Sequence, residues 1–298
     1  MKHRIAVLLA ATALGTAGCQ TIAPATTPDS VSEAARQAQA GAPAAGEPAA
    51  DVLARLAVKG RAPETGYDRD QFGQQWADVD HNGCDTRNDV LARDLVDEAF
   101  TAGSDCVVVT GTLADPYTAQ TISFEKGDGS SVDIDHVIAL SNAWVTGAFA
   151  WDEARRAALA NDPLNLLAVD YSANRQKGDG DAATWLPSST GYRCSYVARQ
   201  VAVKATYGLW VTQAEHDAMT RVLDTCPGQP VPAPGTAPAA VTPSAPAADG
   251  SAEPSTAPVP EPYANCAAAR AAGAAPLHRG DPGWSDSMDG DGDGIACE

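Results

Sequence analysis

The stretch that decides the fold begins with Val132-Asp-Ile-Asp-His-Val-Ile-Ala-Leu140 and ends with Asn161-Asp-Pro-Leu-Asn-Leu-Leu-Ala-Val-Asp-Tyr-Ser-Ala-Asn-Arg-Gln-Lys-Gly178. Its first part has the composition of a strand, and its last part leads from an apolar strand into a helix. Between Asp133 and Gly178 lie four side chains that can bind a cation or move a proton: Asp135, His136, Asn165 and Asn174. This combination predicts a metal-dependent phosphodiesterase site.

Hydrolysis of a phosphodiester needs an activated water, a cation on the phosphate oxygens, and groups that hold both in line. His136 can accept the proton of the water because an imidazole titrates near neutral pH. Asp135 and Asn174 offer the oxygen ligands that a hard cation such as Mg²⁺ prefers. Neighbouring residues of an extended strand point to opposite faces. We therefore expect a bulge or a strand end where Asp135 and His136 reach one ion.

Three segments carry a family resemblance: Asp135-His-Val-Ile-Ala-Leu140, Asn165-Leu-Leu-Ala-Val169 and Ser172-Ala-Asn-Arg-Gln-Lys-Gly-Asp179. Together they resemble the HNH endonucleases of the ββα-metal fold, in the subgroup found in exported bacterial proteins and GmrSD-type restriction enzymes. The resemblance covers roughly residues 68–226. It implies His136 as general base and Asp135 and Asn174 as metal ligands. It also implies that Asn165 braces the loop and orients the histidine.

The sequence departs from that family pattern in two places. Ala139 stands where many members carry Pro, and residues 137–164 form an insertion between His136 and Asn165. We expect two short helices in the insertion, with Trp144 and Trp151 in the core.

Three cationic side chains near the motif are candidates for phosphate contact: Arg87, Arg175 and Lys177. For Arg175 and Lys177, a solvated helix face is an equally good explanation.

An acidic loop, Asp78-Val-Asp-His-Asn-Gly-Cys-Asp-Thr-Arg-Asn-Asp89, has the spacing of a calcium-binding loop. We expect Asp78, Asp80, Asn82 and Asp89 to hold Ca²⁺ beside Cys84. An Asx-turn with a helix cap, without a metal, is the alternative.

The chain ends with a second acidic loop, in which Asp289, Asp291, Asp293 and Glu298 are the candidate Ca²⁺ ligands. Closely spaced carboxylates repel one another unless a cation is bound. With Tyr263-Ala-Asn-Cys266 and Gly280-Asp-Pro-Gly283, this end is similar to the Excalibur domain of bacterial surface proteins. The similarity implies extracellular calcium binding.

Residues 1–19 have the basic start, short apolar run and small-residue exit of an export signal, too short for a transmembrane helix. Cys19 follows Ala-Gly, as a lipidated cysteine does, and would anchor the protein to a membrane through its lipid. Simple secretion with removal of Cys19 is the alternative. We expect an exported protein, either a periplasmic or outer-membrane lipoprotein or a secreted protein.

The chain has seven cysteines, and setting Cys19 aside leaves an even number, as in disulfide-bonded exported proteins. Sequence alone leaves the connectivity open. The neighbours in sequence are the favoured pairs: Cys84–Cys106, Cys194–Cys226 and Cys266–Cys297.

We divide the rest of the chain by composition. Residues 20–50 are expected to be a disordered tether, 51–226 the nuclease domain, 227–262 a Pro/Ala-rich linker, and 263–298 the calcium-binding module. Within the nuclease domain, apolar spacing predicts helices from residue 51, at 89–100 capped by Asp89, at 195–207, and after a capping box at Thr212. Strands are expected at 106–113, 121–125 and 132–138. The predicted fold is α+β, a ββα-metal core embedded in helices plus a small module stabilised by a disulfide and Ca²⁺.

The formal net charge is −18 and no segment forms a long basic stripe, so nucleic-acid binding must rest on a small local footprint plus a metal ion. The leading hypothesis is an exported, monomeric, metal-dependent endonuclease of low sequence specificity that cleaves DNA in preference to RNA. The alternative is a calcium-dependent cell-envelope or adhesion protein with a vestigial nuclease site.

Overall fold

The computed structural model describes residues 27–127, 131–233, 235–238, 263, 265–271, 277–278, 285, 288 and 295–296. The chain divides into two compact units, Met1–Ser244 and Ala245–Glu298. In the second unit, α9 (Cys266–Ala271) accompanies an antiparallel pair of short strands, β6 (Leu277–His278) and β7 (Ile295–Ala296). No helix in the described ranges has the length and apolar character needed to span a membrane.

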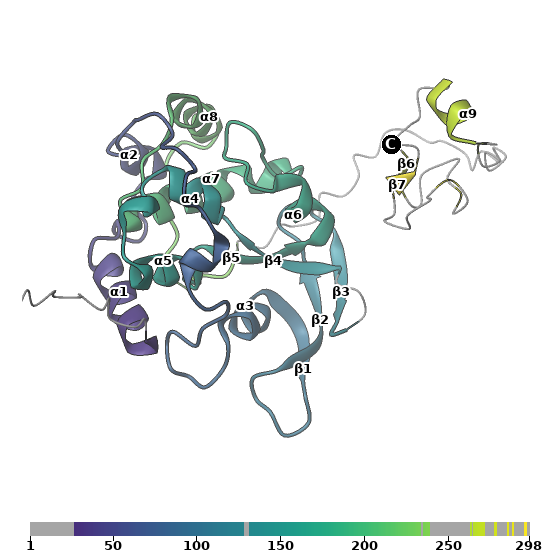
Figure 1. Cartoon of the computed structure of the whole chain (residues 1–298), viewed down its shortest axis with the longest axis horizontal. Coiled ribbons are helices and arrows are strands. Elements are labelled where there is room, and N and C mark those ends of the chain that lie inside the picture. The colour runs from purple at the N-terminus through teal and green to yellow at the C-terminus, as the bar shows by residue number, and fades with distance from the viewer. Residues whose placement is uncertain are drawn as a thin grey trace, which may run out of the picture. The chain divides into compact units, whose positions relative to one another are not determined.

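The first unit combines helices with two small antiparallel sheets (Figure 1). Its helices are α1 (Pro28–Ala40), α2 (Ala49–Leu53), α3 (Thr86–Asp94), α4 (Leu140–Val145), α5 (Glu153–Ala160), α6 (Tyr171–Lys177), α7 (Arg193–Tyr207) and α8 (Gln213–Leu223), with 3-10 turns at Arg69–Phe72, Ala148–Ala150 and Thr190–Tyr192. Its strands are β1 (Leu95–Phe100), β2 (Val108–Ala114), β3 (Thr121–Glu125), β4 (Val132–His136) and β5 (Leu166–Asp170). The mixed α+β class predicted from the sequence is confirmed.

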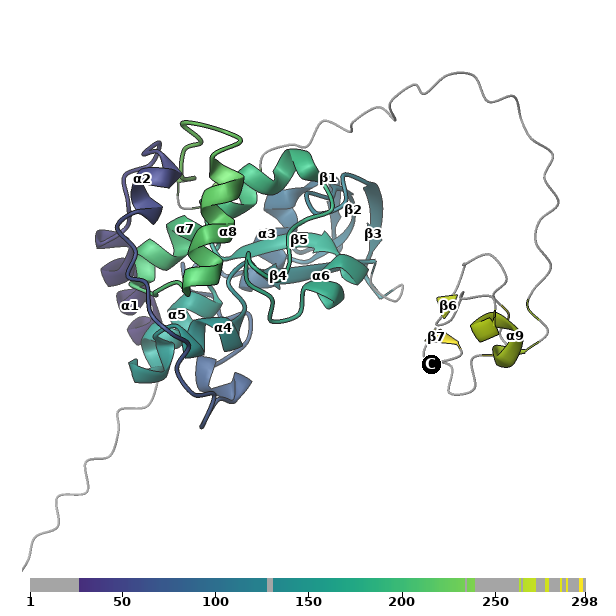
Figure 2. The same cartoon turned by 90° about the horizontal axis from the view of Figure 1, so that it is seen from above.

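The middle of this unit is a two-stranded ribbon of β4 and β5 (Figures 1 and 2). The strands pair without a bulge from Val132 opposite Asp170 to His136 opposite Leu166. The helix α6 begins directly after β5 and packs against both strands, which gives the order strand, strand, helix. Because the register is regular, side chains alternate strictly between the two faces of β4.

Each face of the ribbon is buried in a different apolar cluster. Val132 and Ile134 of β4 face a cluster built with α3 and the β1–β3 sheet. Leu167 and Val169 of β5 face the larger cluster, to which α4, α5, α7 and α8 contribute. Figures 1 and 2 show α3 on one side of the ribbon and α6 on the other. Burial on both faces explains why Leu166–Val169 is apolar at every position.

The helix predicted at 89–100 is wrong beyond Asp94. Residues 95–100 form β1 instead, which pairs antiparallel with β2 so that Leu95 lies opposite Leu113. Val96, an apolar residue of the predicted helix, is 58% exposed. The cap is also different, because the Asp85 carboxylate accepts the Asn88 amide hydrogen at the start of α3. Strand pairing satisfies the backbone here and outweighs a weak helical preference.

The tether predicted at 20–50 is wrong for Pro28–Ala40, which is the helix α1. A capping box between Thr27 and Ser30 starts it, and it packs against α5 and α7 with Val31 and Ala38 buried. Small apolar residues at helical spacing are sufficient to stabilise a helix when a neighbouring surface covers them.

The linker predicted at 227–262 also begins too early. Pro230 bridges to Pro48 and Val231 is 2% exposed, so the packed body continues to this point.

Several predictions are confirmed. The helix α7 covers 195–207, Thr212 and Glu215 form the capping box of α8, and the insertion holds α4 and α5 with Trp144 buried. Trp151, also predicted in the core, is only half-buried and packs against the larger cluster. The structure pairs Cys84 with Cys106 and Cys194 with Cys226. The predicted Cys266–Cys297 pair includes Cys297, which lies outside the described residues, as do residues 1–19 with Cys19.

Candidate active site

Asp135 lies on the face of β4 that is turned toward α6. Its Oδ1 accepts a hydrogen bond from Lys177 Nζ at 2.8 Å, and its Oδ2 accepts one from the Tyr117 hydroxyl at 2.5 Å. Lys177 Nζ also donates to the His136 carbonyl oxygen at 2.8 Å. The side chains of Lys177 and Asp135 are 0% and 5% exposed. Both oxygens of Asp135 are therefore engaged inside the protein.

Tyr117 is enclosed by aromatic rings, with its centroid 4.9 Å from that of Trp185 and 5.6 Å from that of Tyr196. Burial, followed by the charge of Asp135, raises the pKa of Tyr117 well above its usual value. The hydroxyl stays protonated and acts as a donor. A buried ion pair is stable only when its remaining polar atoms are also satisfied, and Tyr117 supplies that bond.

The predicted metal ligands Asp135 and Asn174 do not come together. Asn174 lies on α6, but its Nδ2 donates to Asp133 Oδ2 at 2.8 Å. A cation on Asp135 would have to displace the ammonium of Lys177 or the hydroxyl of Tyr117. Among the described residues, no three His, Cys, Asp or Glu side chains are grouped to hold a metal ion. In this arrangement the Asp135–Asn174 pair does not fit a divalent cation.

His136 points to the opposite face of β4. Its Nε2 lies 2.9 Å from the carbonyl oxygen of Ala160. A carbonyl can only accept, so the proton of the neutral imidazole is on Nε2 and Nδ1 carries the lone pair. The Trp76 ring stacks on the imidazole, with centroids 6.2 Å apart and planes at 19°. As expected, β4 ends at His136, but its pairing with β5 has no bulge, and the side chains of Asp135 and His136 stay on opposite faces.

The His136 imidazole is neutral at physiological pH. Burial is the main cause that lowers its pKa from 6.5 to about 4, and the positive charge of Arg69 lowers it further. The carbonyl of Ala160 and the carboxylate of Asp135 raise the pKa, while the ammonium of Lys177 lowers it. An unprotonated imidazole with a fixed tautomer can accept a proton at Nδ1.

A small pocket, with a cavity volume of about 20 Å³, opens beside His136. Its lining comes from the segment before α3, from β4 and α4, and from the end of α5: Arg69, Phe72, Gly73, Gln74, Gln75, Trp76, His136, Leu140, Ala160 and Asn161. Arg69 and Trp76 were not predicted from the sequence. The available signal was a large aromatic and a cation in an otherwise polar stretch, and such residues are usually structural.

The segment that carries Trp76 is held by one buried amide. The Asn161 Oδ1 accepts from the Ala77 backbone at 2.9 Å, and its Nδ2 lies 3.3 Å from the Gln74 carbonyl. Trp76 has a φ of 57°, in the left-handed region that a bulky residue rarely adopts. Such a conformation costs about 1–3 kcal/mol and persists only where the surroundings enforce it.

Asn165 ties the loop after β4 to the start of β5. It is 0% exposed, its Oδ1 accepts from the Ile138 backbone at 2.8 Å, and its Nδ2 lies 3.3 Å from the Ile138 carbonyl. The Val137 amide also donates to the Asn165 carbonyl at 2.8 Å. Asn165 thus holds the two residues that follow His136, while its role in orienting the imidazole stays a prediction.

The predicted phosphate contacts lie away from the His136 pocket. Lys177 is buried with Asp135, so neither a phosphate contact nor a solvated helix face describes it. Arg175 is exposed on α6, with its guanidinium 5.5 Å from the centre of the Tyr171 ring. Arg87 is half-buried on α3.

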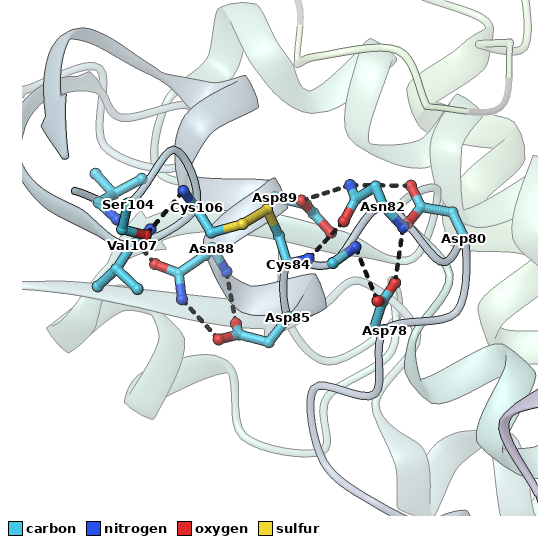
Figure 3. Close-up of a disulfide and its surroundings, with 12 residues drawn as sticks. Asp78, Asp80, Asn82, Cys84, Asp85, Asn88, Asp89, Ser104, Cys106 and Val107 are labelled. Carbon is cyan, nitrogen blue, oxygen red and sulfur yellow. Dashed lines mark hydrogen bonds between the residues drawn. A yellow bond between two sulfur atoms is a disulfide. The ribbon is translucent and has the colours of Figure 1, made fainter. Parts of the chain in front are cut away.

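The acidic loop before α3 is a hydrogen-bonded turn beside the Cys84–Cys106 disulfide (Figure 3). The Asn82 backbone N–H donates to Asp78 and Asp80 at 3.2 Å each, and its side-chain amide donates to Asp89 at 3.0 Å. The carboxylates thus converge on donors of Asn82. This is the geometry of the Asx-turn alternative, with Asp85 and not Asp89 as the cap, and Ca²⁺ binding here stays a prediction.

The C-terminal calcium ligands predicted from the sequence, Asp289, Asp291, Asp293 and Glu298, lie outside the described residues.

Comparison with known proteins gives two family matches. Residues 85–222 match the C-terminal domain of the GmrSD restriction endonucleases, and residues 263–298 match the Excalibur calcium-binding domain. Residues 85–222 are therefore a GmrSD-type, HNH-type domain. A further relative, an uncharacterized secreted protein of Arthroderma benhamiae, is 36% identical over 229 residues, which are 76% of this chain and 100% of the relative. No solved structure matches, so equating β4, β5 and α6 of this GmrSD-type domain with a ββα-metal core stays a prediction.

Proposed function

We propose that this chain is an exported endonuclease in which His136 is the general base for phosphodiester hydrolysis. The observation that carries the proposal is the state of His136 in its pocket. The Ala160 carbonyl fixes the proton on Nε2, which leaves the lone pair of Nδ1 as the proton acceptor, and the pKa, lowered to about 4, keeps Nδ1 unprotonated at neutral pH. The GmrSD-type, HNH-type domain supports a nucleic-acid substrate.

The proposed reaction uses two of this chain's own residues. A water that donates a hydrogen bond to His136 Nδ1 loses its proton to the ring as its oxygen attacks the phosphorus. The phosphorus–oxygen ester bond opposite the attacking water breaks, and the leaving oxygen takes a proton from solvent water. The positive charge of Arg69, which already affects the imidazole, stabilises the negative charge that develops on the phosphate oxygens. A bound phosphodiester anion raises the pKa of His136 again, which makes the imidazole a stronger base when substrate is present.

We propose export on three grounds: the leader-like residues 1–19, the two disulfides, and the relative that is described as secreted. Lipidation of Cys19 and a membrane anchor are part of the same proposal. In the C-terminal Excalibur domain, we propose that Asp289, Asp291, Asp293 and Glu298 bind Ca²⁺. DNA is the proposed substrate in preference to RNA.

Cleavage assays on the purified mature protein test the proposal. His136→Ala should lower kcat for plasmid DNA by about 10²–10⁴-fold, the usual contribution of general-base catalysis. The matched control is His216→Gln, which removes an imidazole from α8. Normal cleavage by folded His136→Ala would exclude the catalytic assignment. Parallel reactions with RNA and with a chelator identify the preferred substrate and any need for a divalent ion.

A second candidate function is a calcium-dependent envelope protein with a vestigial nuclease site. The engaged carboxylate of Asp135 favours it, because the ligand pair expected of the family is not assembled. The same assay separates the two candidates. A folded wild-type protein that binds Ca²⁺ and cleaves neither DNA nor RNA, with Mg²⁺ or Mn²⁺ supplied, is the outcome that this second candidate predicts.

A further inference from the structure

We propose that Arg69 and Trp76 form a binding subsite for one nucleotide of a nucleic-acid strand, with the phosphate on Arg69 and the base against the Trp76 ring. Both residues line the pocket that contains His136. They also lie before residue 85, outside the part of the chain that matches the nuclease family. The inference rests on the proposed function, because it assigns substrate recognition to the same pocket.

The Trp76 ring is held in place before any ligand binds. Its plane is 19° from that of His136, and Asn161, which accepts from the Ala77 amide and donates to the Gln74 carbonyl, fixes the backbone on both sides of it. The residue itself is only half-buried, and part of its ring packs on the smaller apolar cluster. Aromatic rings bind bases by stacking without selecting their sequence. A ring fixed in advance loses little entropy on binding, which favours affinity.

Arg69 supplies the positive charge of the pocket. It is exposed, lies in the 3-10 turn Arg69–Phe72, and makes no ion pair within 4.0 Å with any other described residue. A guanidinium presents a planar fork of donors that matches the oxygens of a phosphate. Since the whole chain has a net charge of −18, a phosphate can be attracted only at such local positions.

The size of the pocket limits how the ligand binds. Its cavity of about 20 Å³ has room for about one water molecule, so a base does not enter it. The base must instead lie at the mouth of the pocket, against the half-buried Trp76 ring. Because stacking on Trp76 needs an unpaired base with a free face, the subsite should favour single strands, or duplex ends whose terminal base can leave the stack.

Binding of a short, labelled phosphorothioate oligonucleotide by the full mature chain tests the subsite through fluorescence anisotropy. Trp76→Leu should weaken binding of single-stranded DNA about fivefold to a hundredfold, the range for loss of one stacked base. Trp76→Phe keeps an aromatic face and should stay within about threefold of wild type. RNA of the same sequence and a DNA duplex serve as the comparison ligands. Duplex should bind more weakly than either single strand.

Arg69→Gln provides an independent measurement. It should weaken binding and reduce the slope of log affinity against log salt by about 0.7, the value for one phosphate contact on a single strand. Arg221→Gln, which removes an exposed cation from the last turn of α8, is the matched control and should change neither quantity. Because Arg69 is exposed, this variant keeps the test decisive even if Trp76→Leu fails to fold.

The outcomes separate this inference from the proposed function. If the wild type cleaves nucleic acid while Arg69→Gln and Trp76→Leu bind as the wild type does, the subsite is wrong and the nuclease assignment stands. A wild type that neither binds nor cleaves nucleic acid overturns both. A uniform loss in both variants with an unchanged salt slope in Arg69→Gln indicates a structural effect and also overturns the subsite.

Discussion

The two faces of β4 present adjacent residues in opposite chemical states. Toward α6, both carboxylate oxygens of Asp135 are engaged by Lys177 and Tyr117, and the side chains of the pair are almost fully buried. Toward the β1–β3 side, His136 uses one ring nitrogen for the Ala160 carbonyl and borders a pocket. A polar group whose hydrogen bonds are all made inside the protein stabilises the fold, whereas a fixed group that still has a free hydrogen-bonding atom is available for chemistry.

The difference shows why a sequence motif does not define a site. In Asp135-His136 the two side chains are separated by the strand between them, because the pairing with β5 has no bulge. Each residue therefore acquires its neighbours from a different part of the chain. Asp135 meets Lys177 of α6, and His136 meets Arg69 and Trp76 of the segment before α3.

The largest expected effect is a loss of stability on the face of β4 that is turned toward α6. Asp135→Ala leaves the Lys177 ammonium buried without its partner, which should lower the free energy of unfolding by about 3–5 kcal/mol. Asp133→Ala, the control, removes a half-buried carboxylate on the same face and should cost about 1 kcal/mol. Urea unfolding followed by circular dichroism measures both.

The double variant Asp135→Leu with Lys177→Met sharpens this result. Since it removes both charges together, it should recover most of the stability lost in Asp135→Ala. A loss below about 1 kcal/mol in Asp135→Ala would show that the buried ion pair does not stabilise the ribbon.

A smaller effect is expected on the His136 face when the pH is lowered. The pKa of His136 is about 4 in the folded protein and 6.5 ordinarily, so between these values the unfolded chain binds more protons. Stability due to His136 is fully present above pH 6.5 and is lost as the pH falls to about 4, by about 3 kcal/mol.

The carboxylates titrate in the same pH range, so the quantity to measure is the difference between wild type and His136→Gln. Between pH 6.5 and 4, the decrease in the free energy of unfolding should be about 3 kcal/mol smaller for the variant than for the wild type. Equal pH dependence in the two proteins would mean that His136 is not held neutral by burial.

Much of the scaffold was predictable because it depends on local signals. The capping box at Thr212, the apolar run of Leu166–Val169 and the pairing of Cys84 with Cys106 all arise from residues close in sequence. The failures have long-range causes. Residues 95–100 become a strand because β2 lies alongside, and α1 forms because α5 and α7 cover it.

For the candidate site, the sequence identified His136 but not its surroundings. The contact between His136 and Trp76 joins residues far apart in sequence, and the bond between Lys177 and Asp135 connects a helix to a strand. From the sequence, a lysine at position 177 was expected to bind phosphate or to face solvent. Only the packing of Tyr117 and α6 shows that Lys177 is buried.

The most direct test of the difference between the two faces is cleavage by Asp135→Asn and His136→Ala, measured as kcat/KM per folded molecule. We predict that Asp135→Asn, once corrected for its folded fraction, stays within about tenfold of wild type, whereas His136→Ala loses about 10²–10⁴-fold. If folded Asp135→Asn loses as much as His136→Ala, then Asp135 leaves Lys177 during the reaction to bind a metal ion or the substrate, and the assignment of the two faces is wrong.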